Sequence, residues 1–162
     1  METEGERVAV KHYDTRVAEV CARLNQHRAK YVIVGATAMQ LWGTTRATRD
    51  IDVLIEATVP NARRVLAALR EVGLGFAKEW LAEEMVAKPV TIIGESPRVD
   101  ILTVAWSVRY PEAAQAATVF TVEGVKVPAA SIEHLIASKR TGRLQDAADI
   151  EVLEEIKRLR GI

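Results

Sequence analysis

The sequence predicts an α+β domain with an α/β-like first half, and three stretches of the chain support this class. Residues 31–34 are a short apolar run with β-branched side chains, good helix formers follow at 36–42, and a second strand is predicted at 50–55. Residues 89–104 are typical of two strands around a Gly-Glu-Ser-Pro turn, which predicts a hairpin. Apolar residues at helical spacing over about 131–160 predict a C-terminal helix pair.

The length and charge of the chain limit the classes of function. With 162 residues, one domain over 1–162 is expected, with its core at about 31–127 and C-terminal helices at about 131–160. The 22 basic and 22 acidic residues cancel, which argues against broad nonspecific nucleic-acid binding but leaves a local basic patch open. No signal peptide or apolar run of membrane length is visible, so a cytoplasmic location without membrane contact is expected. The single Cys21 excludes an internal disulfide and is expected to serve packing.

Two further helices are predicted from capping residues and apolar spacing. Asp14 or Thr15 can cap a helix that runs to about residue 28, and Thr58 begins a helix over 61–72. The side chains expected to be buried on these helices and on the last one are Val17, Val20, Cys21, Leu24, Val65, Leu66, Leu69, Val72, Ile150, Val152, Leu153 and Ile156.

Three charged residues lie near the buried faces of the C-terminal helices. Ser131 is expected to cap the first of these helices and Gly142 to end it, with Lys139 at the next position of the inward face. Asp146 and Asp149 fall on the same side of the last helix as its apolar residues. This placement predicts either an ion pair between the two helices or a role in function.

Two carboxylates lie two positions apart on the predicted strand at 50–55. Strand geometry sends the side chains of Asp50 and Asp52 to the same face, with their Cα atoms about 7 Å apart. Two like charges in this arrangement are unfavourable unless a cation lies between them. Asp100 stands in the middle of a predicted interior strand, where a carboxylate is costly unless it is paired or bound. The three residues predict a metal site, and the alternative is a set of polar side chains on edge strands.

The turn between the strand at 31–34 and the helix at 36–42 predicts an anion site. Backbone N–H groups at a helix N-terminus bind phosphate, and Gly35 permits a close approach. A phosphate site a short connection away from an acidic pair is suited to a metal-bound nucleotide. Without the carboxylates, Gly35 would indicate only a turn.

These segments resemble the polymerase-β-like nucleotidyltransferase superfamily. Its pattern is Gly-Gly or Gly-Ser, a spacer, Asp-x-Asp and a third Asp on a later strand, and Gly35-Ala36, Asp50-Ile-Asp52 and Asp100 follow it in order. The stretches VGATAMQLWGTTRATRDIDVLI and SIEHLIASKRTGRLQDAADIEVL resemble more specifically the minimal bacterial nucleotidyltransferases related to abortive-infection toxins of type IV toxin–antitoxin pairs. The resemblance covers about 31–153 and implies a nucleotidyltransferase fold, a mixed β-sheet with helices packed mainly on one face.

The resemblance also implies roles for the acidic residues. Asp50 and Asp52 hold Mg²⁺, with Mn²⁺ as the alternative ion. Asp100 completes the metal site or activates the acceptor hydroxyl.

Further residues are matched to the nucleotide. The triphosphate is expected to lie against the helix start at Gly35 and Ala36. Ala36 keeps its N–H but lacks the hydroxyl of the superfamily's Ser, and Thr37 offers one a residue later. The other residues matched to phosphate or nucleotide binding are Arg46, Arg49, Lys139 and Asp146. For the two arginines a solvated loop is the alternative, and for Lys139 and Asp146 a structural ion pair.

The function expected from this resemblance is transfer of a nucleoside monophosphate from a nucleoside triphosphate to a hydroxyl acceptor. A tRNA or a protein is the implied acceptor, and an antitoxin protein the implied partner. Two alternatives remain open. A module that binds nucleotide or protein without turnover is favoured by Ala36 and opposed by the three aspartates. A metal-dependent phosphohydrolase would use the same acidic cluster with water as the acceptor.

Overall fold

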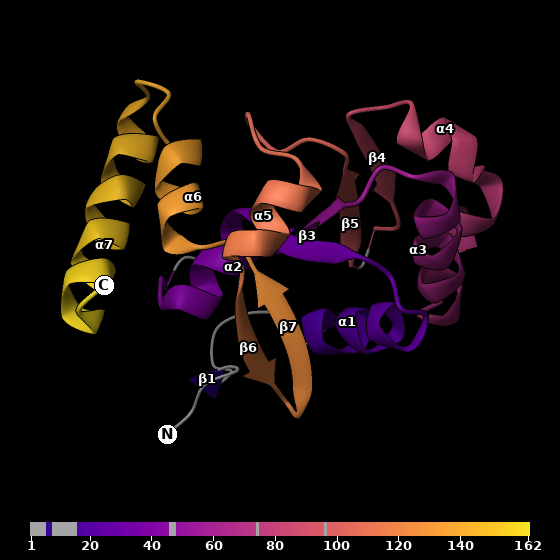
Figure 1. The fold of residues 1–162 in the computed structure, drawn as a ribbon, viewed down its shortest axis with the longest axis horizontal. Helices are drawn as coiled ribbons and strands as arrows, with labels where there is room; N and C mark the ends of the chain where they lie inside the picture. Colours follow the sequence, from indigo (N-terminus) through magenta and orange to yellow (C-terminus); the bar gives the residue numbers. More distant parts are fainter. Residues whose placement is uncertain (1–5, 8–15, 46–47, 74, 96) are drawn as a thin grey trace.

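A seven-stranded mixed β-sheet runs through the protein (Figure 1). The structure is a computed structural model that describes residues 6–7, 16–45, 48–73, 75–95 and 97–162. The strands lie in the order β1-β6-β7-β2-β3-β5-β4. Their bounds are Glu6–Arg7 for β1, Tyr31–Val34 for β2, Asp50–Ile55 for β3, Val90–Ile93 for β4, Arg98–Leu102 for β5, Thr118–Val122 for β6 and Val125–Ala129 for β7.

The sheet is mixed because its central strands pair in both directions. Strand β2 is antiparallel to β3 and parallel to β7, while β3 is parallel to β5. The pairs β4–β5 and β6–β7 are antiparallel hairpins, and β1 pairs in parallel with β6. The α+β class, the mixed sheet and the predicted hairpin before residue 104 are confirmed.

Helices connect and cover the strands. Their bounds are Arg16–Gln26 for α1, Gly35–Trp42 for α2, Val59–Glu71 for α3, Ala82–Val86 for α4, Tyr110–Ala116 for α5, Ile132–Ser138 for α6 and Leu144–Arg160 for α7, with a 3₁₀ turn at Gly75–Glu79. Two predicted caps are confirmed: the hydroxyl of Thr58 accepts from the N–H of Asn61, and that of Ser131 accepts from the N–H of His134. The proposed caps Asp14 and Thr15 lie outside the described residues.

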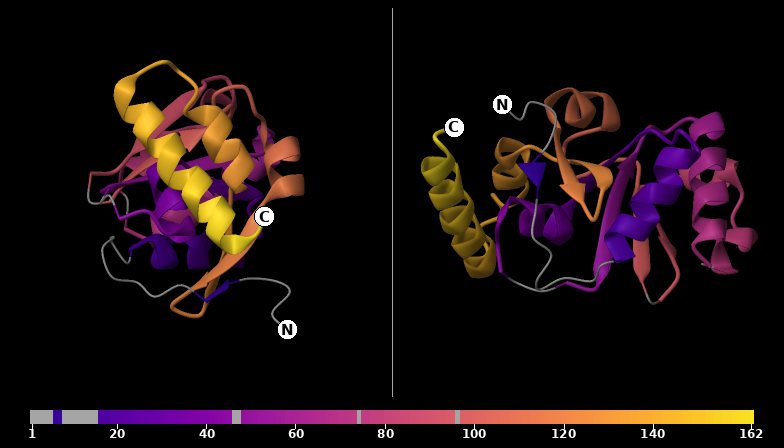
Figure 2. Two further views of the ribbon diagram at one scale, coloured as in Figure 1. Left: turned by 90° about the vertical axis from the view of Figure 1, so that its left-hand side faces the viewer. Right: turned by 90° about the horizontal axis from the view of Figure 1, so that it is seen from below.

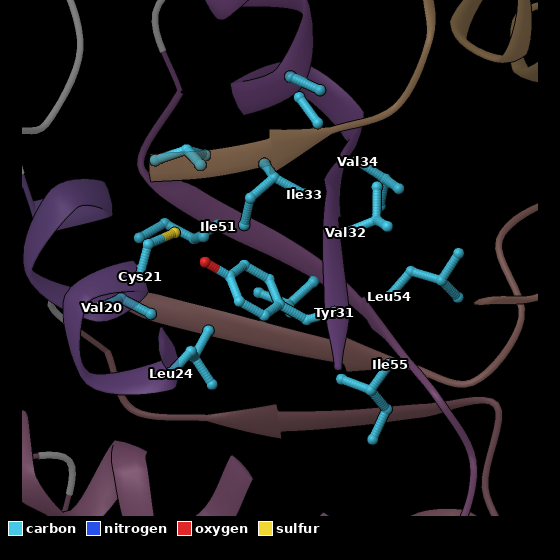
Figure 3. Packing of buried hydrophobic residues seen from close by; sticks show 14 of the residues in the cluster. Val20, Cys21, Leu24, Tyr31, Val32, Ile33, Val34, Ile51, Leu54 and Ile55 are labelled. Atoms are coloured by element: carbon cyan, nitrogen blue, oxygen red, sulfur yellow. The ribbon is translucent and has the colours of Figure 1, made fainter. Parts of the chain in front are cut away.

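One face of the central strands packs against α1. Figure 3 shows Val20, Cys21 and Leu24 of this helix beside Tyr31, as their helical spacing predicted. The Tyr31 hydroxyl donates to Asn25 Oδ1 at 2.8 Å. Burial raises the pKa of the Cys21 thiol to about 12, so this side chain is unreactive and serves packing.

The C-terminal helices α6 and α7 pack together at one end of the molecule, while α3 and α4 lie at the other (Figures 1 and 2). Leu153 is fully buried there, but Val152, which was predicted to be buried, is 46% exposed. That prediction is wrong because α7 packs through one narrow stripe that contains Leu153. Val152 precedes Leu153 and is turned about 100° around the helix from it. Helix α6 also ends at Ser138, before Gly142, so Lys139 lies just beyond the helix.

None of the helices in the described part of the chain combines the length and the apolar character needed to cross a membrane.

Candidate active site

Strand pairing brings the three predicted carboxylates together. In the parallel β3–β5 ladder Asp52 lies beside Asp100, and Asp50 lies beside Arg98. Ile51 and the other residues at odd positions of β3 are buried on the opposite face, so the aspartates share one face as alternation predicted. The Asp50 side chain is 46% exposed and that of Asp100 is 15% exposed. The cluster is therefore open on the side of Asp50 and closed around Asp100.

Asp52 lies where negative charge is poorly compensated. Burial, followed by the charges of Asp100 and Asp50, raises the pKa of the Asp52 carboxyl to about 6. Arg98 and Lys139 act in the opposite direction but do not cancel the effect. A cation beside Asp52 would relieve this repulsion. The sequence predicted such a cation because Asp50 and Asp52 share one strand face.

Gly35 lies directly against the Asp52 carboxylate. A Cβ atom built on Gly35 would lie 2.2 Å from Asp52 Oδ2, and the residue has a φ of +67°. The antiparallel β2–β3 ladder causes this contact because it pairs Val34, the last residue of β2, with Asp52. Helix α2 begins at Gly35 without a side-chain cap. The backbone N–H groups at the start of α2 therefore lie next to the Asp52 carboxylate, which is a suitable metal ligand.

The next two residues of α2 have different surroundings. Ala36 is half-buried and contributes its N–H at the start of the helix. Thr37 is buried, and its hydroxyl donates to the backbone oxygen of Asp50 at 3.1 Å. This hydroxyl is engaged within the fold and fixes α2 to the start of β3. Because the hydroxyl is engaged, Thr37 can offer a phosphate its backbone N–H at the helix start.

Arg98 is a site residue that sequence reasoning missed. Its guanidinium donates from Nε to Asp100 Oδ1 at 2.8 Å and from Nη2 to Asp100 Oδ2 at 3.1 Å. Nε also lies 3.9 Å from Asp50 Oδ2. These contacts raise the pKa of Arg98, with the hydrogen bond to Asp100 as the main cause. The i, i+2 spacing of Arg98 and Asp100 was visible in the sequence and could have indicated their contact. The position of Arg98 beside Asp50 depends on the register of β3 and β5, which the sequence does not show.

Lys139 connects the C-terminal helices with the acidic cluster. Its Nζ lies 3.1 Å from Asp149 Oδ2 and 3.5 Å from Asp146 Oδ1, and both aspartates are buried. Its charge also acts on Asp52, whose pKa it lowers. The predicted ion pair is therefore present, and the ammonium group is close enough to the cluster to affect its charge.

Asp146 is held by its own loop as well. Its Oδ2 accepts from Thr141 Oγ1 at 2.6 Å and from Arg143 Nε at 2.8 Å. The hydrogen bond from Thr141 is the main cause of the lowered pKa of this carboxyl. Asp146 thus pairs with Lys139 while its other oxygen is held by Thr141 and Arg143.

The two predicted arginines precede β3. Arg49 is exposed and lines a small recess with Thr37 and Gln40. Arg46 lies outside the described residues. Arg49 therefore lies one residue before Asp50, in a recess that also includes Val17 and Ile51.

The donor set fits a hard divalent cation. Carboxylate oxygens are the ligands that Mg²⁺ prefers, and Asp50, Asp52 and Asp100 supply them from two adjacent strands. Within the described ranges no three His, Cys, Asp or Glu side chains are already arranged to hold a metal ion. Both oxygens of Asp100 accept hydrogen bonds from Arg98. The uncompensated charge at Asp52 is the observation that favours a cation.

Solved structures of similar fold are nucleotidyltransferases or carry that description. The lincosamide antibiotic adenylyltransferase LnuA, in a lincomycin-bound crystal structure, has a TM-score of 0.57 and 14% identity, over 91% of this chain and 99% of that chain. A putative nucleotidyltransferase from Thermotoga maritima has a TM-score of 0.50 and 16% identity, over 90% and 88% of the two chains.

An antigenic nucleotidyltransferase-like protein from Paracoccidioides brasiliensis has a TM-score of 0.52 and 19% identity, over 90% of this chain and 75% of that chain. At such identities these likenesses concern the fold alone. No curated protein matches the sequence. Residues 13–161 match a protein family described as nucleotidyl transferase of unknown function, DUF2204. Because this match spans nearly the whole chain, the protein belongs to that family and is a nucleotidyltransferase.

Proposed function

We propose that the protein moves a nucleoside monophosphate from a nucleoside triphosphate to a hydroxyl group of an acceptor, with release of pyrophosphate, and that it requires Mg²⁺. The observation that carries this proposal is the contact between Asp52 and Gly35. It places a carboxylate of the acidic cluster beside the uncapped start of α2. A metal ion and a phosphate chain would be held side by side at such a point.

Asp50, Asp52 and Asp100 are the residues that would hold the metal. When bound, the ion supplies charge neutralisation for the triphosphate and for the attacking oxygen. The chain itself binds the phosphates with the N–H groups of Ala36 and Thr37. Asp100 is the candidate to accept the proton of the acceptor hydroxyl on one of its carboxylate oxygens.

Basic residues at the rim are proposed to complete the phosphate site. Arg49 stands beside Asp50 and is exposed, so its guanidinium is free to turn toward a bound triphosphate. Arg46 is proposed for the same role from its match to the superfamily pattern. Lys139 would contact the triphosphate from the side of α6, oriented by Asp146 and Asp149.

The test of the proposed function is calorimetric titration of each nucleoside triphosphate, with and without Mg²⁺, on wild type and on Asp52→Asn. Binding that needs both the metal and Asp52 is expected. Glu133→Gln is the matched control, because Glu133 is an exposed carboxylate paired with Lys157. Absence of binding for every triphosphate in the wild type would contradict the proposal and favour a protein-interaction module.

The acceptor is tested separately with labelled nucleoside triphosphates. The resemblance to abortive-infection toxins supports a tRNA or protein acceptor and an antitoxin partner. Lincomycin is added as a small-molecule candidate because it is bound in the LnuA structure of similar fold. Label that transfers to tRNA, to protein or to lincomycin identifies the class. Label released as free monophosphate without any acceptor would instead support a phosphohydrolase.

For Lys139→Met we expect triphosphate binding to weaken about tenfold, because a charge-assisted contact to phosphate is lost. We also expect lower stability, since Asp146 and Asp149 would be left buried without the ammonium group. Asp149→Asn is the comparison: it keeps the Lys139 charge and the contact to Asp146, so it should lower the melting temperature but weaken binding less than Lys139→Met does. Unchanged binding in Lys139→Met, together with a lower melting temperature, would restrict this residue to the helix–helix ion pair.

A further inference from the structure

We propose that Arg98 is a built-in counter-ion that competes with the divalent metal for the Asp100 carboxylate. The proposal rests on the proposed function, because it assigns Asp100 to the metal site. It adds that Arg98 lowers the affinity of the site for a metal ion that arrives without a triphosphate.

The geometry of the Arg98–Asp100 pair is that of a fork on a carboxylate. Both oxygens of Asp100 accept, at 2.8 Å from Nε and at 3.1 Å from Nη2. Paired hydrogen bonds of this kind are stronger than single-contact surface pairs. The Asp100 side chain is only 15% exposed, so few water molecules compete for it. Arg98 therefore occupies the oxygen atoms that a metal ion would bind.

Arg98 also faces the second carboxylate of the cluster. The parallel register places it beside Asp50, and Nε lies 3.9 Å from Asp50 Oδ2. One guanidinium thus lies between carboxylates on two strands, in the position where the like charges predict a cation. The ion pairs of Arg98 go to Asp100 and Asp50, and within the described residues none joins it to the Asp52 carboxylate. The Arg98–Asp100 pair lies within β5, and the contact to Asp50 reaches across to β3.

The Arg98 side chain can leave this position. It is 42% exposed, so its guanidinium can turn into solvent or toward an arriving anion without being buried unpaired. A metal ion that arrives with a triphosphate brings anionic oxygens, to which an arginine fork is well matched. A metal ion that arrives alone brings none. We therefore expect weak binding of the free ion and stronger binding of the metal–triphosphate complex.

The test is binding of Mn²⁺ alone, measured by calorimetry and by the loss of the free-ion electron paramagnetic resonance signal at pH 8. Arg98→Met is expected to bind Mn²⁺ about five- to tenfold more tightly than wild type, since the competing pair is removed. Arg63→Met is the matched control, because Arg63 forms a single exposed contact to Glu83 at 3.3 Å. Its affinity should equal that of wild type. Unchanged or weaker binding in Arg98→Met overturns the proposal.

Two further variants make the result decisive. Arg98→Gln, a second neutral substitution, should show the same gain and carries the test if Arg98→Met does not fold, as judged by circular dichroism. Adding Asp100→Asn to Arg98→Met should cancel the gain, and a gain that persists would show that Asp100 is not the contested ligand.

Failure of this proposal can be told apart from failure of the proposed function. If wild-type Mn²⁺ binding does not depend on Asp52, the metal site itself is wrong. If binding depends on Asp52 but Arg98→Met leaves it unchanged, only the counter-ion role of Arg98 is wrong.

Discussion

Replacing Asp52 by asparagine is expected to abolish nucleotidyl transfer and, in the absence of metal, to make the protein more resistant to heat. Activity is lost because a carboxylate beside the start of α2 is removed from the proposed metal site. Stability is gained because the substitution removes a buried charge next to Asp50 and Asp100. The two effects have opposite signs, so general damage to the fold cannot account for both.

The stability effect depends on pH in a defined direction. The pKa of Asp52 rises from 3.8 to about 6 on folding, so the folded state binds this proton more tightly than the unfolded state. Stability from this residue is fully present below pH 3.8 and is lost as the pH rises through about 6. The loss amounts to at most about 3 kcal/mol, from the size of the pKa difference.

Thermal unfolding in a chelator at pH 4 and pH 8 measures this effect. Asp52→Asn should melt near the wild-type temperature at pH 4 and clearly above it at pH 8. Adding Mg²⁺ together with a nucleoside triphosphate at pH 8, without chelator, should raise the melting temperature of the wild type and not that of the variant. Asp50→Asn is the comparison, since Asp50 is half-exposed and its loss should remove activity with little gain in stability. Retained transfer in folded Asp52→Asn would contradict the site assignment.

Replacing Gly35 by alanine is expected to remove nearly all nucleotide binding and to destabilise the fold. The new Cβ would lie 2.2 Å from Asp52 Oδ2, so the carboxylate or the helix start must move. The positive φ of +67° adds about 1–2 kcal/mol of strain for a residue with a Cβ. Triphosphate titration and thermal unfolding measure the two consequences.

The chain offers a matched control in the β6–β7 turn. Gly124 also has a positive φ, of +81°, but a Cβ there meets no atom within 4 Å. Gly124→Ala should therefore show the backbone strain alone, with a lower melting temperature and unchanged nucleotide binding. If Gly35→Ala binds triphosphate as Gly124→Ala does, the contact between Asp52 and the helix start has no part in binding.

Local patterns in the sequence predicted much of the fold and, within the site, the shared strand face of Asp50 and Asp52. The alternation of β3 placed Asp50 and Asp52 on one face, and the capping residues Thr58 and Ser131 marked the starts of α3 and α6. These predictions succeeded because each depends on residues a few positions apart. The prediction that Val152 is buried was wrong because burial on α7 depends on which side of the helix the rest of the fold covers.

The sequence by itself determined which residue types carry the chemistry and which of them share a strand face. Only the tertiary structure decided what stands beside them. The β3–β5 register places Asp100 next to Asp52 and Arg98 next to Asp50, and the β2–β3 register presses Gly35 against Asp52. Strand pairing joins segments distant in the chain, and a shift of one residue would turn every partner to the other face. The charge balance of the site is therefore a property of the pairing, which no local pattern contains.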